Sequence, residues 1–193
     1  MYGGTPVRIR TVMRSIVAAV ALGLTAVTAT SANATPGDEP GPKAPPKVLD
    51  LKGGKGLKVE ENAEGRALVE SNLEVAAVTA NVCGSGYTIS TGAARYGTYG
   101  TTYTWTNGTE TGDSYYDKPI CAVFFNDTGY SRYMGIRLKD NYTSTPHVED
   151  FGTYRSYAGP VYQKRGYCGT AYSYMEIGGK AVVDNYKQVG SCN

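Results

Sequence analysis

Four cysteines are the residues of this 193-residue chain whose chemistry is simplest to infer, and they predict disulfide bonds. They are Cys83, Cys121, Cys168 and Cys192, an even number without a Cys-x-x-Cys pair. In an exported chain this pattern is typical of two structural disulfides. Three pairings are possible. We favour the sequential pairing, Cys83–Cys121 with Cys168–Cys192, over the nested pairing, Cys83–Cys192 with Cys121–Cys168.

The chain contains one histidine, His147, within the polar segment "STPHVED". A serine or cysteine nucleophile needs a base within hydrogen-bonding reach, and that base is usually histidine. A turn composition of this kind favours a solvated loop histidine. A zinc site would need several converging histidines and cysteines. We therefore predict no catalytic residues, no metal site and no cofactor.

Carboxylates offer two further kinds of chemistry. Glycoside hydrolysis needs two carboxyl groups across a cleft, but most acidic residues here fall in predicted turns, where aspartate forms local hydrogen bonds. The segment "DNYTST" at 140–145 is similar to the calcium loop of βγ-crystallins, with Thr145 in place of the final serine. The same composition forms ordinary turns, and a turn is what we expect.

Tyrosine is the most distinctive residue type, with 17 tyrosines against three phenylalanines and one tryptophan. Aliphatic residues after position 81 are too few to fill a core, so about half of the tyrosines must be buried. Alternation places Tyr103 and Trp105 among them. Exposed rings beside hydrogen-bonding groups are typical of sugar-binding faces and of protein interfaces. The predicted surface-binding residues are Tyr115, Tyr116, Tyr130, Tyr133, Tyr154 and Tyr167.

The elements that must position these side chains are short strands. From Asn81 onward, apolar and polar residues alternate between glycine-rich turns, which is typical of antiparallel sheet. We predict an all-β fold, a small antiparallel β-sandwich or barrel of about eight strands with two disulfides. The predicted strands are 86–91, 98–106, 120–126, 132–139, 150–157, 159–163, 167–175 and 180–189.

The N-terminal part differs in composition. Three arginines precede an apolar run at 16–27 that ends in "SANA", which predicts a signal peptide over 1–34. Residues 35–80 are rich in proline, glycine and lysine and predict a flexible tail, with a possible short helix at 62–78. The disulfide-linked β domain is then 81–193. No basic stripe favours nucleic acid, and no second apolar segment indicates a membrane contact after signal cleavage.

Several of these motifs together resemble a known family. They are "VCGSGY" at 82–87, a strand similar to "GTxxTxY" around 97–103, Cys121 in a central strand, and "SYAGPVY" at 156–162 followed by Cys168 and a C-terminal cysteine. This order is similar to the spore-associated protein A family of small secreted actinobacterial proteins. The segment "GTAYSYMEIGG" after the third cysteine and the 35–80 extension differ from that family, which indicates a divergent paralogue. The resemblance implies an exported bacterial protein and supplies no catalytic residues.

The "YAGPVY" segment predicts a bend between two strands, with one of Tyr157 and Tyr162 packed inward. Tyr154 and Tyr167 lie near Arg155 and Arg165 in sequence, and we expect both on the outside.

We expect a secreted extracellular or spore-surface structural or adhesive protein without catalytic activity. One alternative is a cell-wall or polysaccharide-binding module, and another is a secreted antimicrobial protein or small hydrolase. The expected partners are the spore surface, a cell-wall polysaccharide or another secreted protein.

Overall fold

The computed structural model describes residues 45–190 and Cys192. Contacts group the described residues into one compact unit. The predicted signal peptide at 1–34, and residues 35–44 of the predicted tail, lie outside the described residues.

The described chain forms ten strands and two short helices. In chain order they are β1 (Val48–Asp50), β2 (Lys58–Glu60), α1 (Arg66–Ser71), α2 (Leu73–Cys83), β3 (Ile89–Tyr96), β4 (Gly100–Thr106), β5 (Ile120–Asn126), β6 (Arg132–Lys139), β7 (Val148–Tyr154), β8 (Tyr157–Gln163), β9 (Thr170–Ile177) and β10 (Lys180–Gln188). The eight strands predicted after residue 81 are all present, with β5 and β6 at the predicted bounds.

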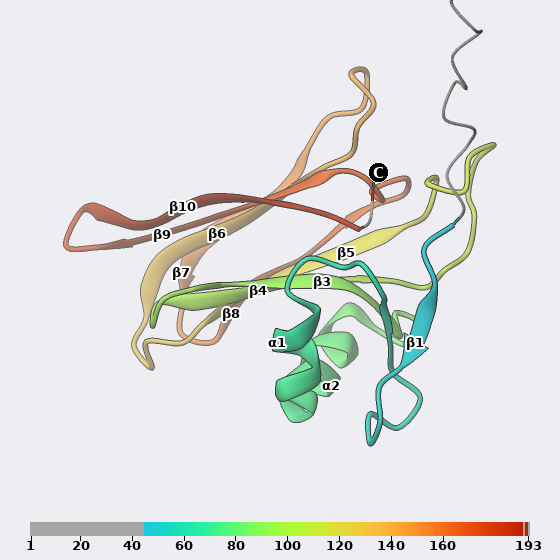
Figure 1. Ribbon diagram of the computed structural model, residues 1–193. Coiled ribbons are helices and arrows are strands. Elements are labelled where there is room, and N and C mark those ends of the chain that lie inside the picture. Colours follow the sequence, from blue (N-terminus) through green and yellow to red (C-terminus); the bar gives the residue numbers. More distant parts are fainter. Residues whose placement is uncertain (1–44, 191, 193) are drawn as a thin grey trace, which may run out of the picture. The chain divides into compact units, whose positions relative to one another are not determined.

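The strands form two sheets, one of six strands in the order β1-β2-β3-β4-β5-β8 and one of four in the order β10-β9-β6-β7. Neighbouring strands are antiparallel except for β2 and β3, which are parallel. Figure 1 shows three layers, in which the six-stranded sheet lies between the four-stranded sheet and the two helices. The predicted all-β sandwich is confirmed, with a helical layer added to it.

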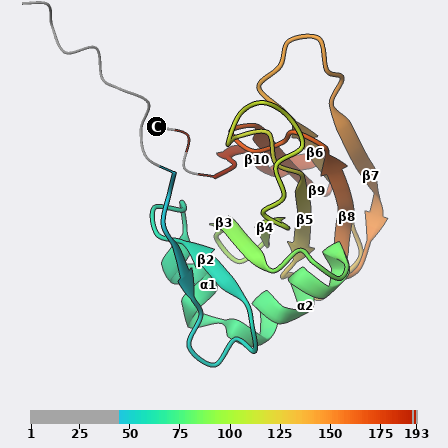
Figure 2. The same ribbon diagram turned by 90° about the vertical axis from the view of Figure 1, so that its right-hand side faces the viewer.

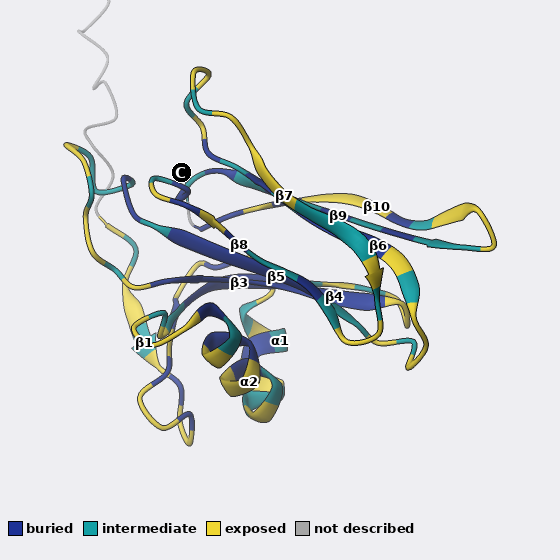
Figure 3. Cartoon of the chain, turned by 180° about the vertical axis from the view of Figure 1, so that it is seen from behind, coloured by how far each residue is buried: buried dark blue, intermediate teal, exposed yellow. Residues whose placement is uncertain are grey.

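The space between the sheets is filled by alternating apolar residues of β5 and β6. Ile120, Ala122 and Phe124 point from β5 toward the four-stranded sheet, where β6 supplies Met134 and Ile136. Side chains alternate along a strand, so the intervening residues of β5 point to the other side. They are buried as well, because the helices cover that side, and β5 is accordingly coloured as buried in Figure 3.

A second core lies between the six-stranded sheet and the helices. Tyr103 and Trp105 of β4 are buried here, as predicted, against Ala76 and Thr79 of α2. The Trp105 indole Nε1 donates a hydrogen bond of 3.0 Å to Thr79 Oγ1. Buried indole N–H groups need such a partner, so this bond fixes how α2 packs on β4. Figure 2 shows both helices against this sheet.

The structure corrects the predicted flexible tail over its described part. Residues 45–80 form β1, β2, α1 and most of α2, and β2 joins the sheet by pairing with β3. The apolar residues Leu51, Val59 and Val69 are buried in the helix-side core. Composition predicted the tail because these apolar residues are sparse, but they are buried in the same core as Tyr103 and Trp105 of β4.

The predicted helix at 62–78 corresponds to two helices separated by Asn72. The backbone of Asn72 is not helical, and its side chain accepts a hydrogen bond of 3.4 Å from Val75 N. Asparagine is a favoured N-cap because its side-chain oxygen satisfies a free N–H of the first turn. Asn72 therefore starts α2 where α1 ends.

The disulfides follow the favoured sequential pairing, Cys83–Cys121 and Cys168–Cys192. The first connects the end of α2 to the beginning of β5. The second connects the segment before β9 to the segment after β10, so it closes a loop around the β9–β10 hairpin.

The "YAGPVY" segment is not the predicted bend between two strands. The chain turns at Arg155 and Ser156, and β8 then continues through Gly159 and Pro160. The register with β5 shifts between Ala122 and Phe124. Gly159 has φ of +95° and lies against the carbonyl of Ala122. Glycine tolerates both conditions, so the motif forms a β-bulge within one strand.

Candidate functional site

Tyr167 was predicted to be exposed, and the structure shows that this is wrong. Its side chain is fully buried, and its hydroxyl donates a hydrogen bond of 2.7 Å to Glu60 Oε2. The neighbouring Arg165 suggested a polar surface, but the Tyr167 ring belongs to the core between the sheets.

Tyr115 and Tyr116 pack around this buried ring. Their ring centroids lie 6.1 Å and 5.7 Å from that of Tyr167 and 5.4 Å from each other. The Lys118 ammonium lies 3.2 Å from the Tyr115 ring centroid. Both tyrosines are half-buried, so they serve mainly as packing for the 107–119 loop.

Tyr154 and Tyr130 have different surroundings. Tyr154 is half-buried beside the inter-sheet core, and its hydroxyl donates to Asp150 Oδ1 at 2.5 Å. Tyr130 is 69% exposed in the turn before β6, and its one ring contact among the described residues is with Arg132, at 5.4 Å. Tyr130 is therefore exposed but isolated.

Of Tyr157 and Tyr162, Tyr157 is the one that packs inward, as predicted for one of the pair. It is half-buried against the helix-side core, with its ring 5.3 Å from that of Phe125. Tyr162 is 41% exposed, and its hydroxyl donates to the carbonyl of Cys83 at 3.1 Å.

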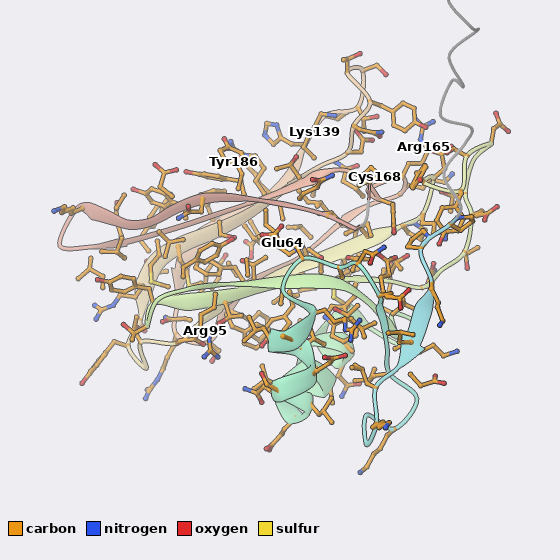
Figure 4. The ribbon with its side chains drawn as sticks, in the orientation of Figure 1. Glu64, Arg95, Lys139, Arg165, Cys168 and Tyr186 are labelled. Atoms are coloured by element: carbon orange, nitrogen blue, oxygen red, sulfur yellow. A yellow bond between two sulfur atoms is a disulfide. The ribbon has the colours of Figure 1, made fainter. Side chains whose placement is uncertain are left out.

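Tyr133 belongs to a larger aromatic surface on the outer side of the four-stranded sheet. Alternation places aromatic residues from all four strands on this side, while Met134 and Met175 point inward. Tyr186 is 69% exposed and Tyr133 is 45% exposed, whereas the other rings are half-buried. Figure 4 shows Tyr186 on the side that faces away from the six-stranded sheet. We call the following residues the aromatic face: Tyr133, Phe151, Tyr172, Tyr174 and Tyr186.

The rings of the aromatic face form a continuous group. The Tyr172 centroid lies 4.7 Å from that of Tyr186, 6.5 Å from that of Tyr174 and 6.4 Å from that of Phe151. The angles between the ring planes in these pairs are 26° to 39°. Tyr133 extends the group, with its centroid 6.4 Å from that of Tyr174.

A glycine in the centre of the sheet allows this arrangement. Gly135 lies between Tyr174 of β9 and Phe151 of β7 in the strand register. A Cβ atom at this position would collide with the Phe151 ring. Because glycine has no Cβ, Phe151 lies over the β6 backbone and approaches the tyrosines of β9.

Two of the tyrosine hydroxyls on the aromatic face form hydrogen bonds with carboxylates. Tyr172 donates to Asp184 Oδ1 at 2.9 Å, and Tyr174 donates to Glu176 Oε2 at 3.0 Å. Neither carboxylate is in an ion pair with any residue of the described chain. Each carboxylate therefore lies at the edge of a ring and keeps capacity to accept further hydrogen bonds.

Arg137 is the cation of this surface, and it is already paired. Its guanidinium carbon lies 5.6 Å from the Phe151 ring centroid and 5.4 Å from that of Tyr172. Its Nε lies 2.5 Å from Glu149 Oε2. His147 Nε2 lies 3.4 Å from the same oxygen, and His147 is exposed, as expected for a loop histidine.

The hydroxyls of Tyr172 and Tyr174 stay protonated well above neutral pH. Burial, followed by the hydrogen bond to Asp184, raises the pKa of Tyr172 to about 12. The hydrogen bond to Glu176 is the main reason why the pKa of Tyr174 is raised. A partner therefore meets neutral phenols that act as donors to fixed carboxylates.

The "DNYTST" segment forms a turn in the structure. The carboxylate of Asp140 accepts hydrogen bonds from Lys139 Nζ at 2.6 Å and from Tyr142 N at 3.1 Å. Across residues 45–190 and Cys192, no cluster of three or more histidines, cysteines or acidic residues could hold a metal ion.

Sequence reasoning identified Tyr133 but missed the rest of the aromatic face. The period-two spacing of Tyr172 and Tyr174 was the available signal for an outward-facing pair. Tyr186 and Phe151 could not be added from the sequence, because their positions depend on strand order and register.

Searches with protein-family models, against curated proteins and against solved structures found no match for this chain. Neither α1 nor α2, the helices of the described part of the chain, is long and apolar enough to cross a membrane.

Proposed function

We propose that this chain is a secreted, non-catalytic protein, extracellular or attached to the spore surface, that adheres to its partner through the aromatic face. The single observation that carries the proposal is the group of five rings on the outer side of the four-stranded sheet, two of them highly exposed. The outer face of an antiparallel sheet is ordinarily polar where it meets solvent. Contiguous exposed rings on such a face indicate a binding surface.

Tyrosine suits this role for a physical reason. Its ring offers a large contact area and loses little side-chain entropy on binding. The contacts among the five rings, together with the hydroxyl bonds of Tyr172 and Tyr174, hold the rings in place before a partner arrives. Such preorganisation lowers the cost of association.

The two disulfides support an extracellular location, because disulfides persist mainly in oxidising compartments. The predicted signal peptide supports export, and the family resemblance is what suggests the spore surface.

A cell-wall or polysaccharide-binding module is the second candidate. The observation that favours it is the interleaving of rings with carboxylates, since sugars present both apolar C–H faces and hydroxyls.

Retention on insoluble surfaces tests the adhesion. The purified, disulfide-bonded secreted chain is mixed with peptidoglycan, chitin, cellulose or intact spores, and the bound fraction is measured. We expect saturable retention on at least one surface and a loss of about tenfold or more in the Tyr133→Ala/Tyr186→Ala variant, because truncation of an aromatic residue that anchors an interface costs about 1 kcal/mol or more.

The matched control is Tyr130→Ala, because Tyr130 and Tyr186 are both 69% exposed but only Tyr186 lies on the aromatic face. The control is expected to bind like the unmodified chain. Equal retention of all three proteins would reject adhesion through this face.

A further inference from the structure

We infer that the partner of the aromatic face is an uncharged polysaccharide, whose sugar rings stack on the tyrosines while its hydroxyls bind the carboxylates beside them. This inference rests on the proposed adhesion through the same face. It specifies the chemical class of the ligand and the groups that recognise it.

The charge of the surface argues against a polyanion. Arg137 is neutralised by Glu149 at 2.5 Å. Glu176 and Asp184 remain without an ion pair to any described residue. Three carboxylates against one guanidinium give the face an acidic balance. Like charges disfavour association, so an anionic polymer would be repelled.

The hydrogen-bonding groups match sugar hydroxyls. One oxygen each of Asp184 and Glu176 accepts a tyrosine hydroxyl. The second oxygen of each carboxylate has no hydrogen-bond partner within the described chain. A hydroxyl group can both donate and accept. It can therefore donate to these oxygens, and a neighbouring hydroxyl can accept from Arg137.

The rings supply the complementary apolar contact. The flat side of each aromatic ring carries negative charge density. This charge density attracts the weakly positive C–H groups on one side of a sugar ring. Because the rings come from all four strands, a polymer contacts several of them at once. Each contact is weak, but repeated units add contacts along the chain.

The same carboxylates argue against a protein partner. The cores of protein interfaces are depleted in aspartate and glutamate. A protein covering the aromatic face would bury Asp184 and Glu176 together with the rings, and burying an unpaired charge is costly. A hydrated polysaccharide leaves these carboxylates in contact with hydroxyls and water.

Soluble neutral and anionic glycans test the inference. Binding of the disulfide-bonded secreted chain is measured by affinity electrophoresis and titration calorimetry. The neutral probes are hydroxyethyl cellulose, glycol chitin that has been N-acetylated, and mannan. The anionic probes are carboxymethyl cellulose, which shares the cellulose backbone, alginate and teichoic acid. We expect saturable binding to at least one neutral probe and at least tenfold weaker binding to every anionic probe.

Variants test whether glycan binding depends on the aromatic face. Tyr186→Ala is expected to weaken binding to the neutral probe about tenfold, whereas Tyr130→Ala leaves it unchanged. The Glu176→Gln/Asp184→Asn variant keeps the acceptor oxygens and removes two charges. It is expected to weaken binding to the neutral probe by about threefold or more, because a carboxylate accepts a stronger hydrogen bond than an amide oxygen does, and to bind anionic probes more tightly than before, because the like-charge repulsion is removed. Thermal unfolding of each variant shows that the fold is intact.

The outcomes separate the two proposals. Binding to anionic probes alone, or to none of the soluble glycans, overturns the inference. If retention on spores or another surface is still lost in Tyr133→Ala/Tyr186→Ala, adhesion through the face stands and its partner is of another class. If no retention depends on the face, both proposals fail.

Discussion

At the residue scale, Lys187 is a charged side chain in the interior. It is 1% exposed on β10, and its Nζ donates to the carbonyl of Gln188 at 2.7 Å. Burial lowers its pKa to about 8, and the negative charges of Glu64 and Glu60 only partly oppose this shift. Burying an ammonium group without full compensation costs free energy. Lys187 therefore destabilises the fold wherever it is charged.

Replacement of Lys187 by methionine should stabilise the protein in a pH-dependent way. Below about pH 8 the lysine is charged in both the folded and the unfolded chain, and the full burial cost of roughly 3 kcal/mol applies. Between about pH 8 and the ordinary lysine pKa of 10.5, the folded chain loses this proton first. The unfolded chain then binds more protons, so the free energy of unfolding rises with pH.

The measurement is urea unfolding of both proteins from pH 7 to pH 9.5. We expect Lys187→Met to be more stable by roughly 1–3 kcal/mol at pH 7, with a gain that shrinks as the pH rises. Tyrosine ionisation is common to both chains and cancels in the difference. A gain that is independent of pH, or a loss at pH 7, would show that the charge of Lys187 is not the cause.

At the scale of the elements, the helical layer depends on a small number of links to the sheet. The helix α2 is held by the bond from Trp105 to Thr79 and by the disulfide Cys83–Cys121. Its outer side is exposed, and Val78 is 50% exposed. This layer should therefore open more readily than the core between the sheets.

Removal of the first disulfide should loosen α2 selectively. In the Cys83→Ala/Cys121→Ala variant we expect a loss of about 2–4 kcal/mol in the free energy of unfolding. Native-state hydrogen exchange should speed up over 73–83 and change little in β6 and β9. Uniform acceleration across all strands would instead mean that the two cores unfold as one unit.

Elements were predicted well from the sequence where the pattern was local. A strand buried on both sides is apolar throughout, as β5 is, and a strand buried on one side alternates between apolar and polar residues, as β6 does. Both patterns can be recognised within the strand itself. The inward position of Tyr167 was not predictable in this way. It depends on contacts with Glu60, Tyr115 and Tyr116, which lie far away in sequence.

At the scale of the whole molecule, the segment before residue 81 completes the domain. The sequence boundary at 81 followed a change in composition, but the apolar residues on either side of it share one core. Tyr103 and Trp105 are buried because Ala76, Thr79 and their neighbours cover them. The side of the six-stranded sheet that bears these two aromatic residues is therefore incomplete without 45–80.

A chain that begins at Asn81 should consequently be poorly folded. It would expose Trp105 and Tyr103 and lose the strand paired with β3. We expect weaker near-ultraviolet circular dichroism, binding of a hydrophobic dye and aggregation, compared with a chain that begins at Thr35. A cooperative thermal transition at the same temperature in both chains would show that residues 81–193 fold without 45–80, as the boundary predicted from the sequence implies.

The second disulfide has a consequence for resistance to proteolysis. Cys168–Cys192 encloses the β9–β10 hairpin, which carries Tyr172, Tyr174 and Tyr186 and turns at the exposed pair Gly178–Gly179. Exposed glycine turns are preferred sites of proteolytic cleavage. A single cut at this turn would leave β10 covalently attached through the disulfide and paired with β9 along its length. A protease could thus nick this turn, and the aromatic face would stay assembled.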